Sequence, residues 1–452
     1  MNKALFSLKA IVSVAILLTL QFFFLNCGQQ MAPSQSTGEV VQAPSSACND
    51  SELIEKETRM RAALQSVVTD HSFYFELRRP SLDGRTFVFT RKIEGAAEGV
   101  IDENSTLQSA STAKMISASV ILDVVSNPQL YPGGGLVNGR QLGLDSLAGD
   151  FLPDGAGGTF WRTNTGAIPA TSRLKSVTLR HLLSFTSGLE LEKSGTGTNC
   201  LVQPETTFTH GNCVRNLVTV NLARNTNALD PRTFFYNGAH LSVAALMAVK
   251  AAGVANWAEL FKKYKELHGV FQGAVSPAAP AATFGLGAYF PYSDGASSPG
   301  PAGAMRYRAG DYATFLVKLY SGNILSNAIL SQMLSDQTGL MGAGIEYSPM
   351  LNSAPYEDWH YGLGLWNECH SSTWSTSCDK ARFSSAGSFG SYPFIDFNFY
   401  GSTSYPLIGF LGRGGDDSGT GDKGMAVYRS LLNGGDLGVK DLAQEWAANT
   451  CH

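Results

Sequence analysis

The sequence predicts an α/β (α+β) fold in which an antiparallel sheet is built from both ends of the chain and is flanked by terminal helices. Strand-like runs occur near both ends, whereas helical patterns fill the middle. Hydrophobic residues make up 44% of the 452 residues, so the chain can bury a sizeable core. No internal repeat is visible, and we expect one domain with an all-helical insertion.

Local patterns define the expected elements. Apolar residues at helical spacing predict helices over 51–68, 111–125, 241–252, 311–320, 425–432 and 441–448. Runs rich in aromatic and aliphatic residues predict strands over 73–78, 86–91, 361–366, 384–389, 394–399 and 406–410. The helix over 241–252 is well defined, because Ala and Leu dominate it and Gly253 follows as a stop signal.

The N-terminus carries the pattern of an export signal. Lys3 and Lys9 precede an apolar stretch over 10–25, which is shorter than the about 20 apolar residues that a membrane-spanning helix needs. The stretch ends in Phe-Leu-Asn-Cys-Gly, which resembles a bacterial lipobox with Cys27 as the acylated residue. Asn26 departs from the small residue that is common at its position. The alternative is a plain signal peptide followed by an incidental cysteine.

The lipobox interpretation divides the chain into three parts. We expect a lipoprotein signal peptide over 1–26, a flexible tether over 27–50 and the folded domain over 51–452. The tether is polar and rich in small residues, a composition that is typical of flexible linkers. The protein would then be an exported bacterial lipoprotein, held in the periplasm or at the outer membrane through a lipid on Cys27.

Cysteine usage agrees with an oxidising compartment. Beyond Cys27 the chain has six cysteines, and six cysteines can pair in many ways. Locality suggests the pairs Cys200–Cys213 and Cys369–Cys378, after which Cys48–Cys451 would join the two ends of the domain. No Cys-x-x-Cys pair and no His/Cys ligand spacing occurs, so we expect no metal site.

Charge and motif content exclude several function classes. Lys and Arg number 33 against 37 Asp and Glu, a net charge of -4, and no basic stripe is present. Nucleic acid is therefore not an expected partner. The sequence also lacks a G-x-S-x-G elbow, an H-E-x-x-H zinc motif and a phosphate-binding loop.

One Ser-x-x-Lys motif can carry nucleophilic chemistry. Ser111 and Lys114 are three positions apart at the start of a predicted helix, so their side chains share one face. A serine hydroxyl needs a neighbouring base, and a lysine can serve if burial lowers its pKa. Backbone N–H groups at the helix start would stabilise an oxyanion. The alternative is an ordinary serine cap followed by a solvated lysine.

A second segment makes the enzyme interpretation specific. Residues 177–189, Val-Thr-Leu-Arg-His-Leu-Leu-Ser-Phe-Thr-Ser-Gly-Leu, closely resemble a signature of the serine β-lactamase and penicillin-binding-protein-like hydrolases. The segment has no catalytic role in that family, but its distance from the Ser-x-x-Lys motif is typical. The resemblance covers roughly residues 70 to 450. It implies the fold of that family, with a helical subdomain over about 115–300.

The resemblance also implies a catalytic tyrosine. The family carries Tyr-x-Asn before a helix that ends in Gly, and the 17-residue step from Tyr236 to Gly253 matches. Tyr236 then takes the tyrosine position, where it accepts or returns a proton, and Gly238 replaces the asparagine. A rival register would put Phe235 in the tyrosine position and remove the hydroxyl. A further alternative is that Tyr236 only packs in an aromatic core.

The third motif of the family is Lys-Thr-Gly or His-x-Gly on an inner strand. The match here is Ser385-Ala386-Gly387, in which Gly387 would admit a substrate backbone and Ser388 would add an oxyanion N–H to that of Ser111. Ser385 removes the usual cation, which puts recognition of a β-lactam or D-Ala carboxylate in doubt. Arg413 could supply the charge instead, although we expect it in a surface loop.

These motifs predict acyl transfer in two steps. Ser111 would attack an ester or amide carbonyl while Lys114 and Tyr236 share the proton, with no metal or organic cofactor. The substrate class extends from esters and amides to cell-wall peptides that contain D-amino acids. The competing hypothesis is a non-catalytic module that binds peptidoglycan or a partner. His181 and His240 lie in helical runs and are expected to be structural.

Overall fold

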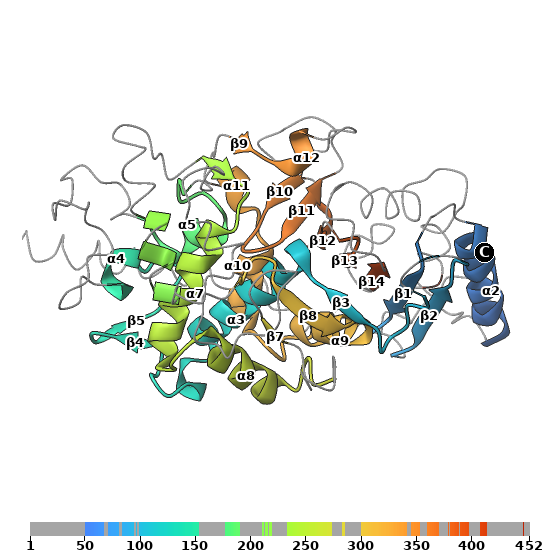
Figure 1. Cartoon of the computed structure of the whole chain (residues 1–452), viewed down its shortest axis with the longest axis horizontal. Helices are drawn as coiled ribbons and strands as arrows, with labels where there is room; N and C mark the ends of the chain where they lie inside the picture. Colours follow the sequence, from blue (N-terminus) through green and yellow to red (C-terminus); the bar gives the residue numbers. More distant parts are fainter. Residues whose placement is uncertain are drawn as a thin grey trace, which may run out of the picture. The chain divides into compact units, whose positions relative to one another are not determined.

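The structure is a computed structural model, and the chain divides into two units, Met1–Ala47 and Cys48–His452. The described residues are 50–66, 71–80, 84–94, 96, 99–152, 177–189, 210–211, 213–215, 217–218, 233–273, 283–284, 300–340, 345–352, 359–369, 378, 380–387, 389–396, 407–413 and 446. All of them lie in the second unit, which Figure 1 shows with its helices and strands labelled. The expected signal peptide and nearly all of the expected tether fall outside these residues.

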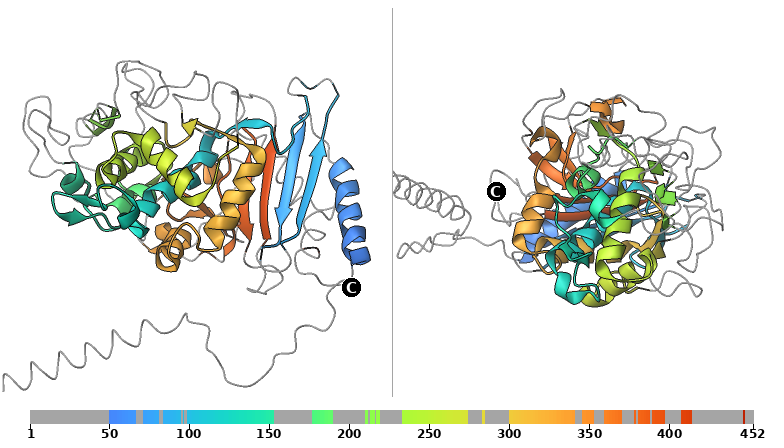
Figure 2. Two further views of the ribbon diagram at one scale, coloured as in Figure 1. Left: turned by 90° about the horizontal axis from the view of Figure 1, so that it is seen from below. Right: turned by 90° about the vertical axis from the view of Figure 1, so that its left-hand side faces the viewer.

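The main sheet has seven antiparallel strands in the order β10-β11-β12-β13-β14-β1-β2. Its strands are β1 (Phe73–Arg78), β2 (Thr86–Arg91), β10 (Trp359–Tyr361), β11 (Trp366–Cys369), β12 (Lys380–Ser384), β13 (Tyr392–Asp396) and β14 (Leu407–Arg413). Strand β1 lies between β2 and β14, with Phe73 opposite Arg413. Figure 2 shows the blue N-terminal strands beside the red C-terminal ones. The predicted fold class, with a sheet built from both ends of the chain, is confirmed.

The described helices are α2 (Asp50–Ser66), α3 (Ala113–Ser126), α4 (Ala148–Phe151), α5 (Leu179–Leu183), α7 (Ala239–Ala252), α8 (Trp257–His268), α9 (Ala309–Tyr320), α10 (Asn327–Leu334), α11 (Gln337–Leu340) and α12 (Pro349–Asn352), with 3-10 turns at η1 (Ala110–Thr112) and η2 (Pro128–Leu130). Helix α9 packs on β1, β13 and β14, and α2 packs on β2. Helix α3 packs against α7 and α8, and its side chains are buried on almost every side. An apolar helix that is buried all round marks the centre of a large core.

Small strands position the loops around the N-terminal end of α3. Strand β8 (Met305–Arg308) lies between β3 (Thr106–Gln108) and β7 (Thr283–Phe284). Strand β6 (Phe234–Phe235) runs parallel to β9 (Ile345–Tyr347), and β4 (Leu136–Val137) pairs with β5 (Arg140–Gln141). Residue 109 therefore follows β3 directly, and residue 236 follows β6 directly. These two junctions carry the candidate site.

Two predicted strands are interrupted or cut short in the structure, whereas β13 and β14 overlap the strands expected over 394–399 and 406–410 but have shifted ends. The strand expected over 361–366 is two strands, because Gly362 to Leu365 turn between β10 and β11. Gly364 adopts φ +82° there and lies against Ala118 of α3, where a side chain would collide. The strand expected over 384–389 ends at Ser384. A turn follows, in which the N–H of Gly387 donates to the carbonyl of Ser391.

The disulfide predicted between Cys369 and Cys378 is confirmed. Cys213 is also disulfide-bonded, and its partner lies outside the described residues, as do Cys48, Cys200 and Cys451. The closing helices expected over 425–432 and 441–448 are outside them too, apart from Trp446, which is helical and packs on Phe87. In the described part of the chain no single helix is long and apolar enough to cross a membrane. Taken together, α7 and α8 have the length and the apolar composition of a membrane span, but the pair is bent by 69°.

Candidate active site

Ser111 lies in the turn η1, immediately before α3, and its side chain is partly exposed. Two contacts of Ser109 fix this turn: its hydroxyl accepts a hydrogen bond from the N–H of Met305 at 2.9 Å and donates to the carbonyl of Gly303 at 3.0 Å. Ala110, which lies between Ser109 and Ser111, has φ +41°, a conformation that residues with a side chain rarely adopt. Strand β8 and its preceding turn therefore hold the serine in place at the helix start.

Lys114 reaches Ser111 from the next turn of the helix. Its Nζ lies 2.8 Å from Oγ of Ser111 and 2.9 Å from the carbonyl oxygen of Ala302. The side chain is 6% exposed, and burial lowers the pKa of the amine to about 7. A large fraction of the amine is therefore neutral near pH 7, and only the neutral amine can accept a proton from the serine.

Tyr236 completes the group from the opposite side. Lys114 Nζ lies 4.8 Å from the centre of its ring, and its phenol interacts with the hydroxyl of Ser111 and with the indole of Trp366. Burial raises the pKa of this phenol, although these two interactions act in the lowering direction. Phe235 instead packs against Tyr347 with tilted rings, whose centres are 5.5 Å apart. The structure thus brings Tyr236, and not Phe235, to the serine and the lysine.

An aromatic wall that the sequence did not predict supports Tyr236. The ring of Trp366 stacks on it, with centroids 4.9 Å apart and planes 21° apart. Tyr361 meets both rings edge-on, at 6.0 Å from Tyr236 and 4.8 Å from Trp366. Trp366 begins β11 and Tyr361 ends β10, so the turn between these strands places both. Edge-to-face and offset-stacked pairs are the favoured arrangements of aromatic rings.

The third predicted motif lies against the turn η1. The hydroxyl of Ser385 donates to the carbonyl of Ser111 at 3.2 Å, and it also interacts with the phenol of Tyr312, whose pKa this interaction acts to lower. A Cβ on Gly387 would lie 2.7 Å from the carbonyl oxygen of Ser109. Glycine is therefore required here by the chain's own backbone, which differs from the predicted role of admitting a substrate. Ser388, the predicted oxyanion donor, lies outside the described residues.

Comparisons with known proteins identify the fold. No protein-family model matches the chain, and no curated protein sequence matches it. A putative β-lactamase from Bacteroides dorei DSM 17855 matches in structure, with 17% identity, 85% of this chain and 100% of the other covered, and a TM-score of 0.53. The chain has a β-lactamase-like fold. This finding confirms, at the level of fold, the resemblance that the motifs at 109–114 and 177–189 predicted.

Two further solved structures share the β-lactamase-like fold. The D-amino acid amidase from Ochrobactrum anthropi SV3 is 15% identical, with 87% of this chain and 99% of the amidase covered and a TM-score of 0.52. EstCE1, a hydrolase with promiscuous acyltransferase activity, is 14% identical, with 88% and 99% covered and a TM-score of 0.50. Similarities at this level of identity establish the fold, and the chemistry has to be argued from the side chains.

The structure also places three other residues of this β-lactamase-like chain that the sequence analysis named, and one of these predictions was wrong. Arg413 is not in a surface loop: it ends β14 and is 5% exposed, and its side chain packs where a Cβ on Gly390 would lie. Gly238, in place of the family's asparagine, is the residue that precedes α7. His181 caps α5 together with Thr178, in agreement with the structural role expected for it.

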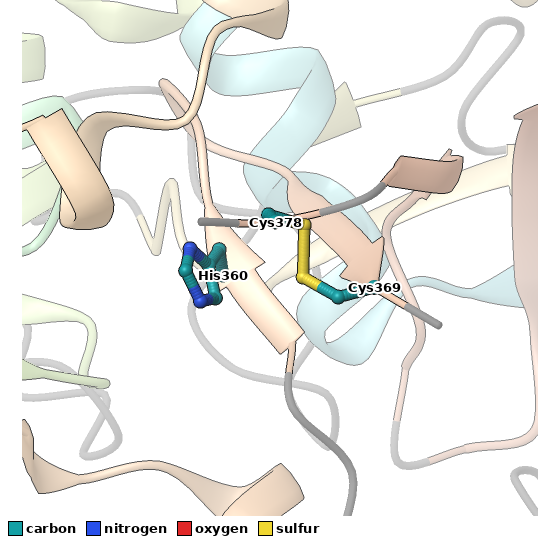
Figure 3. A group of neighbouring side chains, drawn as sticks. All are labelled: His360, Cys369 and Cys378. Atoms are coloured by element: carbon teal, nitrogen blue, oxygen red, sulfur yellow. A yellow bond between two sulfur atoms is a disulfide. The ribbon is translucent and has the colours of Figure 1, made fainter. Parts of the chain in front are cut away.

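One group of potential metal ligands lies on the sheet. Figure 3 shows His360 beside the two sulfur atoms of Cys369 and Cys378, and the three ligand atoms are within 4.8 Å of one another. The sulfurs are bonded to each other, so neither is available as the thiolate that binds a metal. His360 Nδ1 contacts the carboxylate of Asp336 at 2.5 Å. These residues form a disulfide-linked structural group of the β-lactamase-like domain.

Proposed function

We propose that the protein is a serine hydrolase that forms an acyl-enzyme on Ser111 from an ester or amide substrate. The observation that carries the proposal is the short contact between a partly exposed serine hydroxyl and a buried lysine with a pKa of about 7. A base whose pKa lies near the working pH is well suited to general-base catalysis. The similarity to solved hydrolases supports the same reaction class.

The proton path follows from the two pKa shifts. Burial raises the pKa of Tyr236, so its phenol keeps its proton, whereas Lys114 is partly neutral and can accept one. As the Oγ–carbon bond of Ser111 forms, its proton passes to Nζ of Lys114. The proton then passes, through the phenol of Tyr236, to the departing alcohol or amine as its bond to the acyl carbon breaks. Water or another acceptor releases the acyl group by the same steps in reverse.

Backbone N–H groups would stabilise the oxyanion. The N–H of Ser111 lies at the start of α3, where unpaired donors and the helix dipole favour negative charge. We keep the N–H of Ser388 as the second donor of this proposal, on the strength of its place after Gly387 in the third motif. No metal or organic cofactor enters the mechanism.

The proposed substrate class is broad. At the position where related enzymes carry Lys or His, Ser385 directs its hydroxyl to the carbonyl of Ser111, so this position offers no cation to a substrate carboxylate. Uncharged esters and amides are therefore favoured over substrates that present a free carboxylate there. Cell-wall peptides that contain D-amino acids remain in the class, since a matching structure is a D-amino acid amidase.

Hydrolysis of p-nitrophenyl butyrate by the wild type and by Ser111→Ala tests the proposal. We expect kcat to fall about 10³-fold or more in Ser111→Ala, because the nucleophile is lost. Ser126→Ala is the matched control, since Ser126 also lies on α3 and its hydroxyl accepts a hydrogen bond from the N–H of Ser326. Equal rates in the wild type and Ser111→Ala would refute the assignment.

The competing function is a non-catalytic module that binds peptidoglycan or a partner. Gly238 and Ser385 favour it, because both replace polar or charged groups of the family's motifs. A fluorophosphonate and a fluorescent penicillin distinguish the two functions, since either labels an activated serine. If folded protein reacts with neither reagent, the binding module is the better assignment.

We further propose that the protein is exported and anchored to a membrane through a lipid on Cys27. The lipobox-like sequence and the disulfide between Cys369 and Cys378 support this proposal, because structural disulfides are typical of oxidising compartments. Metabolic labelling with a radioactive fatty acid should label the wild type and not Cys27→Ser. Equal labelling of both proteins would contradict the anchor.

A further inference from the structure

A buried histidine lies four residues after Tyr236, at the start of α7. His240 is 0% exposed, its Nδ1 lies 2.7 Å from the hydroxyl of Ser187, and its Nε2 lies 2.9 Å from the carbonyl oxygen of Phe235. Burial lowers its pKa to about 3, so the ring is neutral over the ordinary pH range. It therefore acts through directed hydrogen bonds and not through charge.

The surrounding groups select one tautomer of His240. The carbonyl of Phe235 can only accept, so Nε2 carries the proton and donates it there. Nδ1 is then the acceptor for the hydroxyl of Ser187. The amide of Asn237 donates to the carbonyls of Leu189 and Phe235, and its oxygen accepts from the N–H of Ala239. The nitrogen of this amide also lies 2.9 Å from Nε2 of His240. Because its two N–H groups point to the carbonyls of Leu189 and Phe235, it is not a hydrogen-bond donor to Nε2 in this tautomer.

The contact with Phe235 holds the peptide group that precedes Tyr236. The oxygen of this group accepts from His240, while its N–H, which belongs to Tyr236, donates to the carbonyl of Tyr347 at 3.0 Å. A peptide group is planar, so fixing both ends fixes its orientation. The direction in which the side chain of Tyr236 leaves the backbone is fixed with it.

A second route from His240 to Tyr236 runs through Phe185. The rings of His240 and Phe185 stack, with centroids 5.0 Å apart and planes 13° apart. Phe185 then meets the ring of Tyr236 edge-on at 5.5 Å. Its backbone carbonyl also accepts a hydrogen bond from the N–H of Phe235 at 3.0 Å. The imidazole thus supports both the backbone and the ring of Tyr236.

We propose that His240 is a positioning residue that aims the phenol of Tyr236 at Ser111 and Lys114, with the hydroxyl of Ser187 donating to its Nδ1. The inference rests on the proposed function, because the position of the phenol matters for the rate only if Tyr236 transfers a proton. A small displacement of a catalytic group can cost about 10²-fold in rate. Loss of this positioning should therefore lower the reaction rate, whereas loss of a contact that only stabilises the fold should not.

The alternative is a core histidine that contributes stability alone, and the chain offers a matched control for it. His210 is also buried, and its Nε2 lies 2.8 Å from the carbonyl of Ser242 on the same helix, α7. Its hydrogen bond has the same chemistry as that of His240, but it does not touch the peptide before Tyr236. The two histidines therefore separate positioning from stability.

The test compares variants of both histidines in hydrolysis of p-nitrophenyl butyrate. His240→Phe keeps a stacking ring and loses both hydrogen bonds, so we expect kcat to fall about 10- to 100-fold with KM changed less than about twofold. His240→Gln keeps a donor near Nε2 and should recover part of the rate. His210→Phe and His210→Gln should keep kcat within about twofold of wild type. Ser187→Ala, which leaves the ring in place, should show a smaller fall than His240→Phe.

Tyrosine labelled with carbon-13 at Cζ gives a readout that does not depend on turnover. The signal of Tyr236 is assigned by its loss in Tyr236→Phe, and we expect it to move in His240→Phe and to stay in His210→Phe. The proposal is overturned if the signal does not move, or if the His240 and His210 variants lose activity in equal measure. If Ser111→Ala hydrolyses the ester at the wild-type rate, the proposed function fails, while the carbon-13 signal still decides the positioning role.

Discussion

The carbonyl oxygen of Ala302 accepts a hydrogen bond from Nζ of Lys114 at 2.9 Å, although 188 positions separate the two residues. In the neutral amine this contact occupies one N–H and fixes the direction of the nitrogen. The lone pair can then face Oγ of Ser111, which lies 2.8 Å from the same nitrogen. The turn before β8 is thus part of the candidate site, through its backbone alone.

The first prediction concerns pH. The pKa of Lys114 is lowered to about 7 by burial, and only the neutral amine accepts the serine's proton. We therefore expect kcat/KM to rise with pH and to level off above an apparent pKa of about 7. Ester hydrolysis between pH 5 and pH 9 measures this, at about half-unit steps. A flat profile, or full activity in Lys114→Arg, would contradict the role of the lysine.

The second prediction concerns the free energy of unfolding that is lost by burying the amine of Lys114. The folded pKa of about 7 is below the ordinary value of 10.5, so the unfolded chain binds the proton more tightly. The cost is therefore fully present below about pH 7 and disappears as the pH rises through the unfolded value. Lys114→Met should abolish activity and raise the free energy of unfolding at pH 7 by a few kcal/mol, of the order of 3. Urea unfolding of both proteins from pH 7 to pH 10 should show the difference shrinking, and a constant difference would rule out this origin.

The third prediction concerns Trp366. Trp366→Phe keeps a ring on Tyr236 but removes the indole N–H, whose interaction with the phenol acts to lower the pKa of Tyr236. We expect kcat to fall about 3- to 10-fold, consistent with the loss of one polar interaction of about 1 kcal/mol. Trp359→Phe is the control, because Trp359 packs on Trp366 at 6.1 Å and is also buried. Equal effects of the two substitutions would assign both to packing.

The fourth prediction concerns the backbone of Ala110, next to Ser111. Ala110 has φ +41°, which glycine adopts freely and a β-branched residue strongly resists. Ala110→Val should lower the free energy of unfolding by about 1–3 kcal/mol and reduce activity as Ser111 shifts. Ala110→Gly should retain activity. Thermal unfolding with ester hydrolysis checks both variants, and equal tolerance of valine and glycine would show that the turn carries no such constraint.

The fifth prediction concerns the disulfide between Cys369 and Cys378, which are nine positions apart. A loop of this size stabilises a folded protein by about 2–3 kcal/mol in the chain-entropy description. The double variant Cys369→Ser and Cys378→Ser should unfold at a correspondingly lower urea concentration. Comparison with this variant is preferable to adding reductant, because Cys213 is disulfide-bonded as well. An unchanged midpoint would contradict the prediction.

Elements with strong local patterns could be predicted from the sequence. Strands β1 and β2 begin and end where the runs of aromatic and aliphatic residues do. The turn inside 361–366 could not be predicted, because Gly364 packs on Ala118 of α3 and Gly362 packs on the carbonyl of Met333 in α10, and both helices are distant in the sequence. Packing between distant segments decides such cases, and an aromatic-rich run gives no sign of it.

In the candidate site, too, features set by local spacing could be predicted and features set by distant segments could not. The spacing of Ser111 and Lys114 fixes their common face within one helix, and the structure joins them at 2.8 Å. Ala302 and Trp366 escaped the sequence analysis because one acts through its backbone and the other through a fold-dependent stack. The burial of Arg413 escaped it as well, because the end of β14 could not be placed from local pattern alone.

The pairing of β1 with β14 has a consequence for how the chain is made. Because Phe73 lies opposite Arg413, one edge of β1 has no sheet partner until almost the whole protein has been synthesised. Contacts this far apart in sequence slow folding, and an open strand edge can pair with other chains while it waits. A chain that stops before residue 407 would keep this edge, and we expect it to aggregate or to need a chaperone.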